Sequence, residues 1–186
     1  MARLRETLGS LPEAFATPAF VVVSGLPGTG KSFFCRQLAQ KSPFYILESD
    51  TIRKTLFSSP DYSAEESSRL FGACHSLIQE LLDKGVPLIF DATNLSERNR
   101  EHLYRIADTA GARLVLVRVE APSAVVYQRL RARGNGASPE DKSDADWQVY
   151  RRMKPGADKI GRNHLVVDTS RDIAPVIDKI VRMISH

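Results

Sequence analysis

The stretch Gly25-Leu26-Pro27-Gly28-Thr29-Gly30-Lys31-Ser32 decides the fold that we expect for this chain. It contains a glycine, four further residues, a second glycine, a lysine and a hydroxyl residue, which is the pattern of a phosphate-binding loop. Glycines allow the backbone to turn so that its N–H groups point inward at a polyphosphate. In such a loop Lys31 would reach between the β- and γ-phosphates, and Ser32 would offer an oxygen to Mg²⁺.

The sequence on either side of this loop agrees with that interpretation. Residues 19–24 form a β-branched apolar run that is typical of a buried parallel strand. Apolar residues then recur at roughly helical spacing over 31–41, and the dipole of that helix would place its positive end behind an anion. The alternative is a chance glycine-rich turn that binds nothing. We predict a nucleoside triphosphate site formed by Gly25, Leu26, Pro27, Gly28, Thr29, Gly30, Lys31, Ser32 and Phe33.

Length and composition predict one globular domain spanning residues 1–186, with 1–17 as an extension to which we assign no chemistry. The net charge of +4 permits an anionic partner, but a nucleotide alone would account for it. Cys35 and Cys74 show no metal-like spacing, so we expect buried thiols. We find no apolar leader and no run of membrane-spanning length, which favours a cytoplasmic protein without a membrane partner.

Alternating patterns along the chain predict the fold class. Short apolar runs at about 19–24, 44–47, 86–90, 113–119 and 164–168 alternate with helical patterns. This arrangement calls for an α/β fold, a three-layer sandwich of the P-loop NTPase type with a five-stranded parallel sheet and helices on both faces. Ligands of such sheets bind at the carboxyl ends of the strands, so the residues that follow each strand are the candidates for chemistry.

Residues with strong local preferences predict where the helices begin and end. Ser63 and Glu66 form a capping box for a long helix that Gly85 ends, and Ser96 is expected to cap a helix to about Ala110. Pro122 takes the favoured first position of a helix that leads into a lid region at about 129–145. That region includes a polar, flexible stretch at 134–142, and Ser143 is expected to cap a further helix through Trp147 to Met153.

Asp50 is the best candidate for a general base, because it follows the second strand and a carboxylate can accept the proton of a hydroxyl acceptor. Its alternative role is helix N-capping. Arg53 lies one helical turn further and can pair with an anionic group by bidentate hydrogen bonds; its alternative is a solvated helix surface. Asp91 ends the third strand, where it can hold Mg²⁺ directly or through water, or serve only as a structural hydrogen-bonding group.

These segments together resemble a known family. The loop, residues 49–53, residues 89–98 and the pair Arg129 and Arg133 follow in the same order in the 5′-hydroxyl kinase domain of phage polynucleotide kinase. The wider group includes zeta toxins, chloramphenicol phosphotransferase and bacterial ATP-binding kinases, and the resemblance spans about residues 19–180. This chain departs from the best-known member in having no room for a separate phosphatase domain.

The resemblance implies a role for each matching residue. It implies that Asp50 is the general base, that Arg53 binds an acceptor phosphate and that Arg133 is the lid arginine that meets the transferring phosphoryl group. Arg129 would lie over the adenine as a cation–π partner. The predicted acceptor pocket consists of Asp50, Arg53, Asp91, Asn94 and Arg98, while Ser32 and Asp91 would hold the metal.

The sequence therefore predicts an ATP- and Mg²⁺-dependent kinase in which Lys31, Asp50 and Arg133 act on transfer to a hydroxyl group. The acceptor is a polynucleotide 5′-end or a small molecule such as a nucleoside, sugar or antibiotic. Aromatic residues are not interleaved with basic ones as single-strand binding requires, so nucleic acid is not indicated independently. The other alternative is an ATP-binding regulatory module without transfer. The sequence lacks the Asn-Lys-x-Asp stretch of a GTPase, and it leaves the oligomeric state open.

Overall fold

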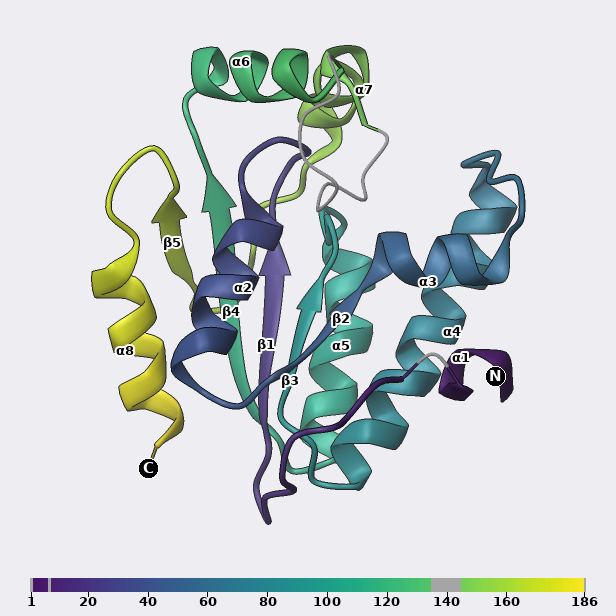
Figure 1. Cartoon of the computed structure of the whole chain (residues 1–186), viewed down its shortest axis with the longest axis vertical. Coiled ribbons are helices and arrows are strands. Elements are labelled where there is room, and N and C mark those ends of the chain that lie inside the picture. The colour runs from purple at the N-terminus through teal and green to yellow at the C-terminus, as the bar shows by residue number, and fades with distance from the viewer. Residues whose placement is uncertain (1, 7, 135–144, 186) are drawn as a thin grey trace.

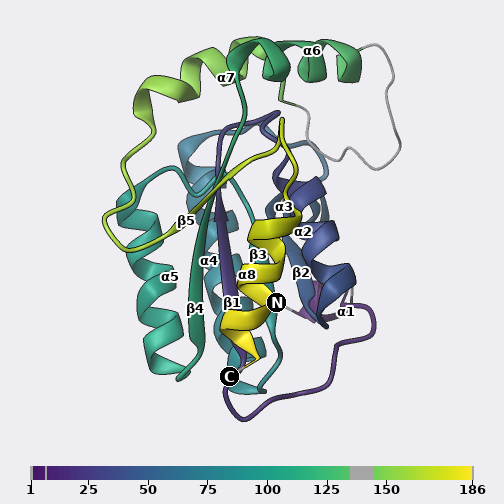
Figure 2. The same cartoon turned by 90° about the vertical axis from the view of Figure 1, so that its left-hand side faces the viewer.

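The computed structural model (Figures 1 and 2) describes residues 2–6, 8–134 and 145–185. Its centre is a five-stranded parallel sheet in the order β2-β3-β1-β4-β5. The strands are β1 (Ala19–Ser24), β2 (Tyr45–Glu48), β3 (Leu88–Asp91), β4 (Arg113–Glu120) and β5 (Leu165–Asp168). All of β1 is buried, as its β-branched run predicts for a central parallel strand. The predicted fold class is confirmed.

Helices cover both faces of the sheet (Figures 1 and 2). Side chains of α2 (Lys31–Lys41) and α8 (Ala174–Ile184) pack on one face, in a core cluster that includes Phe34, Leu38 and Ile177. On the other face α4 (Ala64–Asp83) and α5 (Glu97–Thr109) bury Leu77 and Leu103 in a second cluster, joined by α1 (Ala2–Glu6) and α3 (Ser49–Leu56). The sheet is therefore the middle of three layers, as expected for an α/β fold.

A third group of helices lies across the carboxyl ends of the strands, at the top of Figure 1. It consists of α6 (Ser123–Gly134), α7 (Trp147–Met153) and a 3₁₀ turn, η1 (Lys154–Gly156). Val126 and Leu130 of α6 and Tyr150 of α7 form a small apolar cluster against Leu26 of the glycine-rich loop. This cluster holds the two helices over the edge of the sheet where the candidate residues gather.

Several predicted boundaries need correction. β3 begins at Leu88 rather than residue 86, because Pro87 has no N–H to donate to a neighbouring strand; its carbonyl oxygen accepts from Tyr45 N at the sheet edge, 2.9 Å away. Ser96 precedes α5 but makes no capping hydrogen bond through its side chain. Asp146 rather than Ser143 caps α7, since its carboxylate accepts from Val149 N at 2.9 Å.

Other predicted boundaries are confirmed. Ser63 caps α4 by accepting from Glu66 N at 3.1 Å, and Gly85 follows that helix with a φ of +76°. Ser143 and residues 135–142 of the predicted flexible stretch lie outside the described residues.

Cys35 and Cys74 are free and buried, as predicted, and burial raises the pKa of the Cys74 thiol to about 12. No helix among the described residues has the length and apolar character that crossing a membrane requires.

Candidate active site

The glycine-rich loop joins β1 to α2 at the carboxyl edge of the sheet, and its glycines are required by close neighbours. Gly28 and Gly30 have φ values of +76° and +91°, a region that side-chain-bearing residues rarely adopt. A Cβ at Gly28 would lie 2.8 Å from Leu130 Cγ of α6, and one at Gly30 would lie 2.9 Å from Thr169 Oγ1. The loop is therefore enclosed between α6 and the segment after β5.

Hydrogen bonds fix the start of the loop. Gly25 N donates to Thr93 O at 3.0 Å, and a Cβ at Gly25 would lie 2.4 Å from the backbone oxygen of Val119. Thr29 Oγ1 donates to Leu26 O at 2.8 Å, which closes the turn on itself. These contacts hold the loop in one shape without help from a ligand, which is the preorganisation that phosphate binding by main-chain amides needs.

Lys31 begins α2 directly after the loop, and Gly30 before it offers no side chain to cap the helix. The amides of this helix start are therefore not occupied by a capping side chain, which makes them suitable for an anion. Lys31 Nζ donates to Leu26 O at 3.1 Å within the loop. Burial lowers the pKa of the Lys31 ammonium, and the carboxylates of Asp91 and Asp50 oppose that effect. Lys31 is a half-buried cation close to two acids.

Asp91 is the last residue of β3 and only 6% exposed. Its carboxylate accepts a hydrogen bond from the Ser32 side chain. Burial raises the Asp91 pKa, and the charge of Lys31 and the bond from Ser32 oppose that rise. A hydroxyl oxygen and a carboxylate in contact are the hard oxygen ligands that Mg²⁺ accepts, so these residues fit the predicted metal site.

The described residues contain no group of three or more His, Cys, Asp or Glu side chains placed to hold a metal ion. This agrees with the way Mg²⁺ is held beside a nucleotide, where one or two protein oxygens share the ion with phosphates and waters. The ion would supply neutralisation of charge between the β- and γ-phosphates.

Asp50 lies near both Lys31 and Asp91. It is the second residue of α3, directly after β2, and the end of β2 pairs with β3 in the register Glu48↔Asp91. Its negative charge raises the pKa values of both Lys31 and Asp91. The N-cap of α3 is Glu48, so the alternative role of Asp50 as the capping residue is wrong. The structure brings together the residues predicted for phosphoryl transfer.

The two arginines predicted for the lid both lie on α6. Arg133 is near enough to Lys31 for its charge to lower the Lys31 pKa. Arg129 donates to Thr169 Oγ1 at 2.8 Å and to Thr169 O at 2.9 Å. Thr169 Oγ1 in turn donates to Thr29 O at 2.6 Å, so Arg129 is tied to the loop through Thr169. The adenine contact of Arg129 stays a prediction, and Thr169 is a site residue that the sequence did not indicate.

Arg53 has a packing role that its position in the sequence did not reveal. Its guanidinium forms a buried ion pair with Glu66 of α4 and lies 4.6 Å from the centroid of the Tyr62 ring. Glu66 also accepts from Asp61 N at 2.7 Å. The alternative of a solvated surface is wrong for Arg53, which is 8% exposed. Its predicted contact with an acceptor stays a prediction.

Asn94 lies in the loop after β3 with a φ of +44° and is 2% exposed. Its Nδ2 donates to Val23 O at 2.7 Å, and its backbone oxygen accepts from Ser24 Oγ at 3.0 Å. These bonds fix the loop to β1. Asn94 Oδ1 is buried and has no hydrogen-bond partner among the described residues. Arg98, predicted beside it as a substrate ligand, is exposed on the first turn of α5.

Arg100 is a buried residue that sequence reasoning missed. It is 1% exposed, and its guanidinium donates to Glu97 Oε2 at 2.6 Å and to Asn94 O. It also donates to Asp158 O at 3.1 Å and Lys159 O at 2.9 Å. Arg100 therefore joins the loop after β3 to the segment that follows η1.

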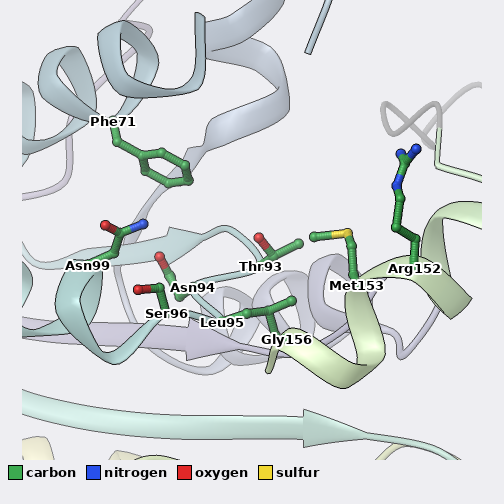
Figure 3. Close-up of a pocket in the computed structure, with 9 residues that line it drawn as sticks. All are labelled: Phe71, Thr93, Asn94, Leu95, Ser96, Asn99, Arg152, Met153 and Gly156. Carbon is green, nitrogen blue, oxygen red and sulfur yellow. The ribbon is translucent and has the colours of Figure 1, made fainter. Parts of the chain in front are cut away.

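A cavity of about 300 Å³ opens between the loop after β3, the start of α5, α4, and the stretch from the end of α7 to η1 (Figure 3). In Figure 3 the Phe71 ring enters it from α4, the Met153 side chain reaches in from the end of α7, and polar side chains rise from the loop after β3. Thr93 connects the cavity to the glycine-rich loop, because its backbone oxygen accepts from Gly25 N. The principal lining residues are Phe71, Thr93, Asn94, Ser96, Asn99 and Met153.

Comparisons with known proteins agree with this fold. The chain is 24% identical over 188 residues to a UPF0200 protein of Thermococcus gammatolerans, covering 87% of this chain and 95% of the relative. A putative kinase from Chloroflexus aurantiacus superposes with a TM-score of 0.72 at 20% identity, covering 90% of this chain and 99% of that one. The APS kinase CysC of Mycobacterium tuberculosis, solved with AMPPNP and APS, superposes with a TM-score of 0.70 at 15% identity, over 91% and 99%.

The structural likenesses establish the P-loop kinase-like fold, while the narrower group of polynucleotide kinase, zeta toxins and chloramphenicol phosphotransferase stays a prediction. A model of the AAA domain matches residues 20–159, which is most of the chain and includes the glycine-rich loop, both acids and the cavity-lining loop after β3. The chain therefore belongs to the AAA domain family AAA_33.

Proposed function

We propose that this chain is an ATP- and Mg²⁺-dependent kinase that transfers the γ-phosphoryl group of ATP to a hydroxyl acceptor. The observation that carries the proposal is the group of Lys31, Ser32, Asp50 and the buried Asp91, which lie together at the end of the glycine-rich loop. The names of the similar structures, which include a putative kinase, an APS kinase and a gluconokinase, support it.

In this proposal the loop amides and Lys31 hold the β- and γ-phosphates, and Ser32 and Asp91 hold the metal. The acceptor oxygen forms a bond to the γ-phosphorus while the bond from that phosphorus to the β,γ-bridging oxygen breaks. Asp50 accepts the proton of the acceptor hydroxyl, and Arg133 faces the charge that develops on the transferring group. The products are ADP and a phosphate monoester.

The acceptor would enter the cavity beside Thr93 and Asn94, on the side of the loop toward α4 and α7. Its volume of about 300 Å³ lies at the small end of ligand pockets. We infer that a small molecule, or a single terminal nucleoside of a polynucleotide, fills it. Arg98 and Arg152 lie exposed near the cavity and would meet an acceptor that extends beyond it.

The proposal is tested by following ATP-dependent phosphorylation of a panel of hydroxyl compounds and 5′-hydroxyl oligonucleotides. Asp50→Asn removes the proton acceptor but keeps the size of the side chain, so we expect transfer to fall by about 10²-fold or more. ATP affinity should stay within about threefold, since Asp50 does not belong to the loop. Unchanged transfer in Asp50→Asn would contradict its role as the base.

The second candidate is an ATP-binding regulatory module that transfers nothing. It predicts ATP binding through Lys31 without any phosphorylated product, and biological activity that survives Asp50→Asn. We also propose that residues 1–186 work as one domain and that the protein acts in the cytoplasm.

A further inference from the structure

The cavity beside the glycine-rich loop is lined by apolar side chains and by the amide side chains of two asparagines. Phe71 and Met153 enter from opposite sides in Figure 3, and Leu95 lies on its floor. Asn94, Ser96 and Asn99 present polar side chains between them. A flat aromatic surface, an adaptable thioether and a few fixed polar groups are the usual lining of a site for a small organic ring.

Asn94 Oδ1 is an acceptor without a hydrogen-bond partner in the part of the chain that the structure describes. Val23 O needs a donor, so the bond of 2.7 Å from Asn94 fixes its amide with Nδ2 toward β1 and Oδ1 on the other side. In Figure 3 the Asn94 side chain rises from the loop toward Phe71 and Asn99. The oxygen is buried and has no partner among the described residues. A buried acceptor left unpaired costs stability, so a ligand that brings an N–H or O–H donor to it gains affinity.

The side chains that line the interior of the cavity do not favour a charged ligand. Among its lining residues Arg152 carries a charge, but it is exposed, and Figure 3 shows its guanidinium turned away from the other side chains. A charged group buried near Phe71 and Met153 would lack a counter-ion in the lining. The part of the ligand that enters the cavity is therefore uncharged.

Resting on the proposed function, we propose that the acceptor is a nucleoside-like small molecule, an alcohol that carries a flat, uncharged ring with an N–H or O–H donor at its edge. The ring lies against Phe71, and its donor reaches Asn94 Oδ1. In this proposal its hydroxyl group is directed toward Asp50, the proposed base. A polyol or simple sugar would leave several hydroxyl groups against Phe71, Leu95 and Met153 without partners, which disfavours it.

The test measures binding rather than transfer. Isothermal titration uses the full chain saturated with Mg²⁺ and a non-hydrolysable ATP analogue, and titrates adenosine, guanosine, cytidine, uridine and inosine against ribose and glycerol. We expect at least one nucleoside to bind about tenfold or more tightly than ribose or glycerol. N-methylation of its ring N–H, as in 3-methyluridine for uridine, should weaken binding by about fivefold or more, because the bond to Asn94 Oδ1 is lost.

A variant separates the ring contact from general apolar packing. Phe71→Leu keeps apolar bulk but removes the aromatic face, and we expect nucleoside binding to weaken by about 2- to 10-fold. Affinity for the ATP analogue should stay unchanged, since Phe71 lies on α4 and not in the loop. The matched control is Phe15→Leu, an exposed phenylalanine before β1 that does not line the cavity.

The inference would be overturned if ribose or glycerol bound as tightly as every nucleoside, if nucleosides failed to bind while the ATP analogue binds, or if Phe71→Leu and wild type had equal nucleoside affinity. Tight binding of a 5′-hydroxyl trinucleotide without binding of nucleosides would also overturn it. These results differ from failure of the proposed function. A nucleoside that binds but is not phosphorylated refutes the kinase alone, and phosphorylation of ribose alone refutes the inference alone.

Discussion

Replacing Arg100 tests whether a single buried guanidinium fixes the loop after β3, which lines the cavity, to the segment after η1. Arg100→Met keeps a long unbranched side chain at this position but removes all of its side-chain hydrogen-bond donors. Its four partners are Asn94 in the loop after β3, Glu97 at the start of α5, and Asp158 and Lys159 in the segment after η1. The substitution therefore separates the loss of hydrogen bonds from the creation of a cavity.

The expected loss of stability depends on which hydrogen bonds the partners of Arg100 retain in the variant. Asn94 O still accepts from Ser24 Oγ, and Glu97, whose side chain is 28% exposed, still accepts from Gly161 N at 3.1 Å. Asp158 and Lys159 are exposed, so water can replace the lost donor. Breaking a buried pair costs about 3–5 kcal/mol, and these partners place the expected loss at the lower end, about 3 kcal/mol. For a chain of this length that lowers Tm by about 6–12 °C.

Urea unfolding followed by circular dichroism at 222 nm, with a thermal melt, measures the loss. Arg98→Met is the matched control, because Arg98 is exposed two residues away on the same helix and should change stability by less than about 0.5 kcal/mol. Arg100→Lys should recover little, since an ammonium cannot reach four acceptors with a planar fork. An Arg100→Met protein within about 1 kcal/mol of wild type, or equal to Arg98→Met, would refute the bridging role.

Three further predictions concern other positions. Gly25→Ala forces a Cβ to within 2.4 Å of a β4 carbonyl oxygen, so we expect loss of nucleotide affinity together with a destabilisation of about 1–3 kcal/mol, measured by nucleotide titration and urea unfolding. Gly72→Ala, at an exposed helical position with no atom near its Cβ, should raise the free energy of unfolding by about 0.5–1 kcal/mol. Burial, and to a smaller extent the charge of His102, lowers the pKa of His75 in the folded state. The unfolded chain therefore binds this proton more readily, so the contribution of His75 to stability is present at neutral pH and is lost as the pH falls below the pKa that His75 has in the unfolded state. His75→Phe should flatten the fall of the urea midpoint from pH 7 to 5, whereas the control substitution of the half-buried His164, His164→Gln, should change it less.

A Gly25→Ala protein with unchanged ATP affinity would mean that the loop can shift away from β4. An unchanged or lower urea midpoint of unfolding in Gly72→Ala would mean that the substitution disturbs the packing of the neighbouring Phe71. A pH slope that His75→Phe leaves intact would assign the titration to other groups.

Local sequence was sufficient for the fold and for the placing of the glycine-rich loop beside the two acids. The phosphate loop is contiguous, and its geometry depends on glycines whose need is visible in the pattern itself. The acids at 50 and 91 follow apolar strands, and parallel strands bring their carboxyl ends to one edge. Capping was less predictable, because Ser143 and Asp146 are both good N-cap residues and composition does not choose between them.

Arg100 could have been recognised from the sequence by a sharper reading of α5. Leu103, Tyr104 and Ala107 are its buried apolar stripe, and Arg100 lies on the same face at helical spacing, whereas Arg98 lies on the exposed face. A charged residue within an apolar stripe is almost never buried unless it is paired, so its position predicts partners. Glu97, three residues before it, was the visible half of that pairing.

The proposed acceptor cavity could not be predicted from local sequence in the same way. Its lining combines α4, the loop after β3 and the end of α7, with Phe71 and Met153 far apart in the chain. No short motif spans such a distance, and each of these side chains has an ordinary packing role when viewed alone. The loop that binds phosphate is set by backbone conformation, which local sequence encodes, while the cavity is set by how distant helices meet. Donor chemistry can therefore be predicted from one segment, but acceptor chemistry follows only from the assembled fold.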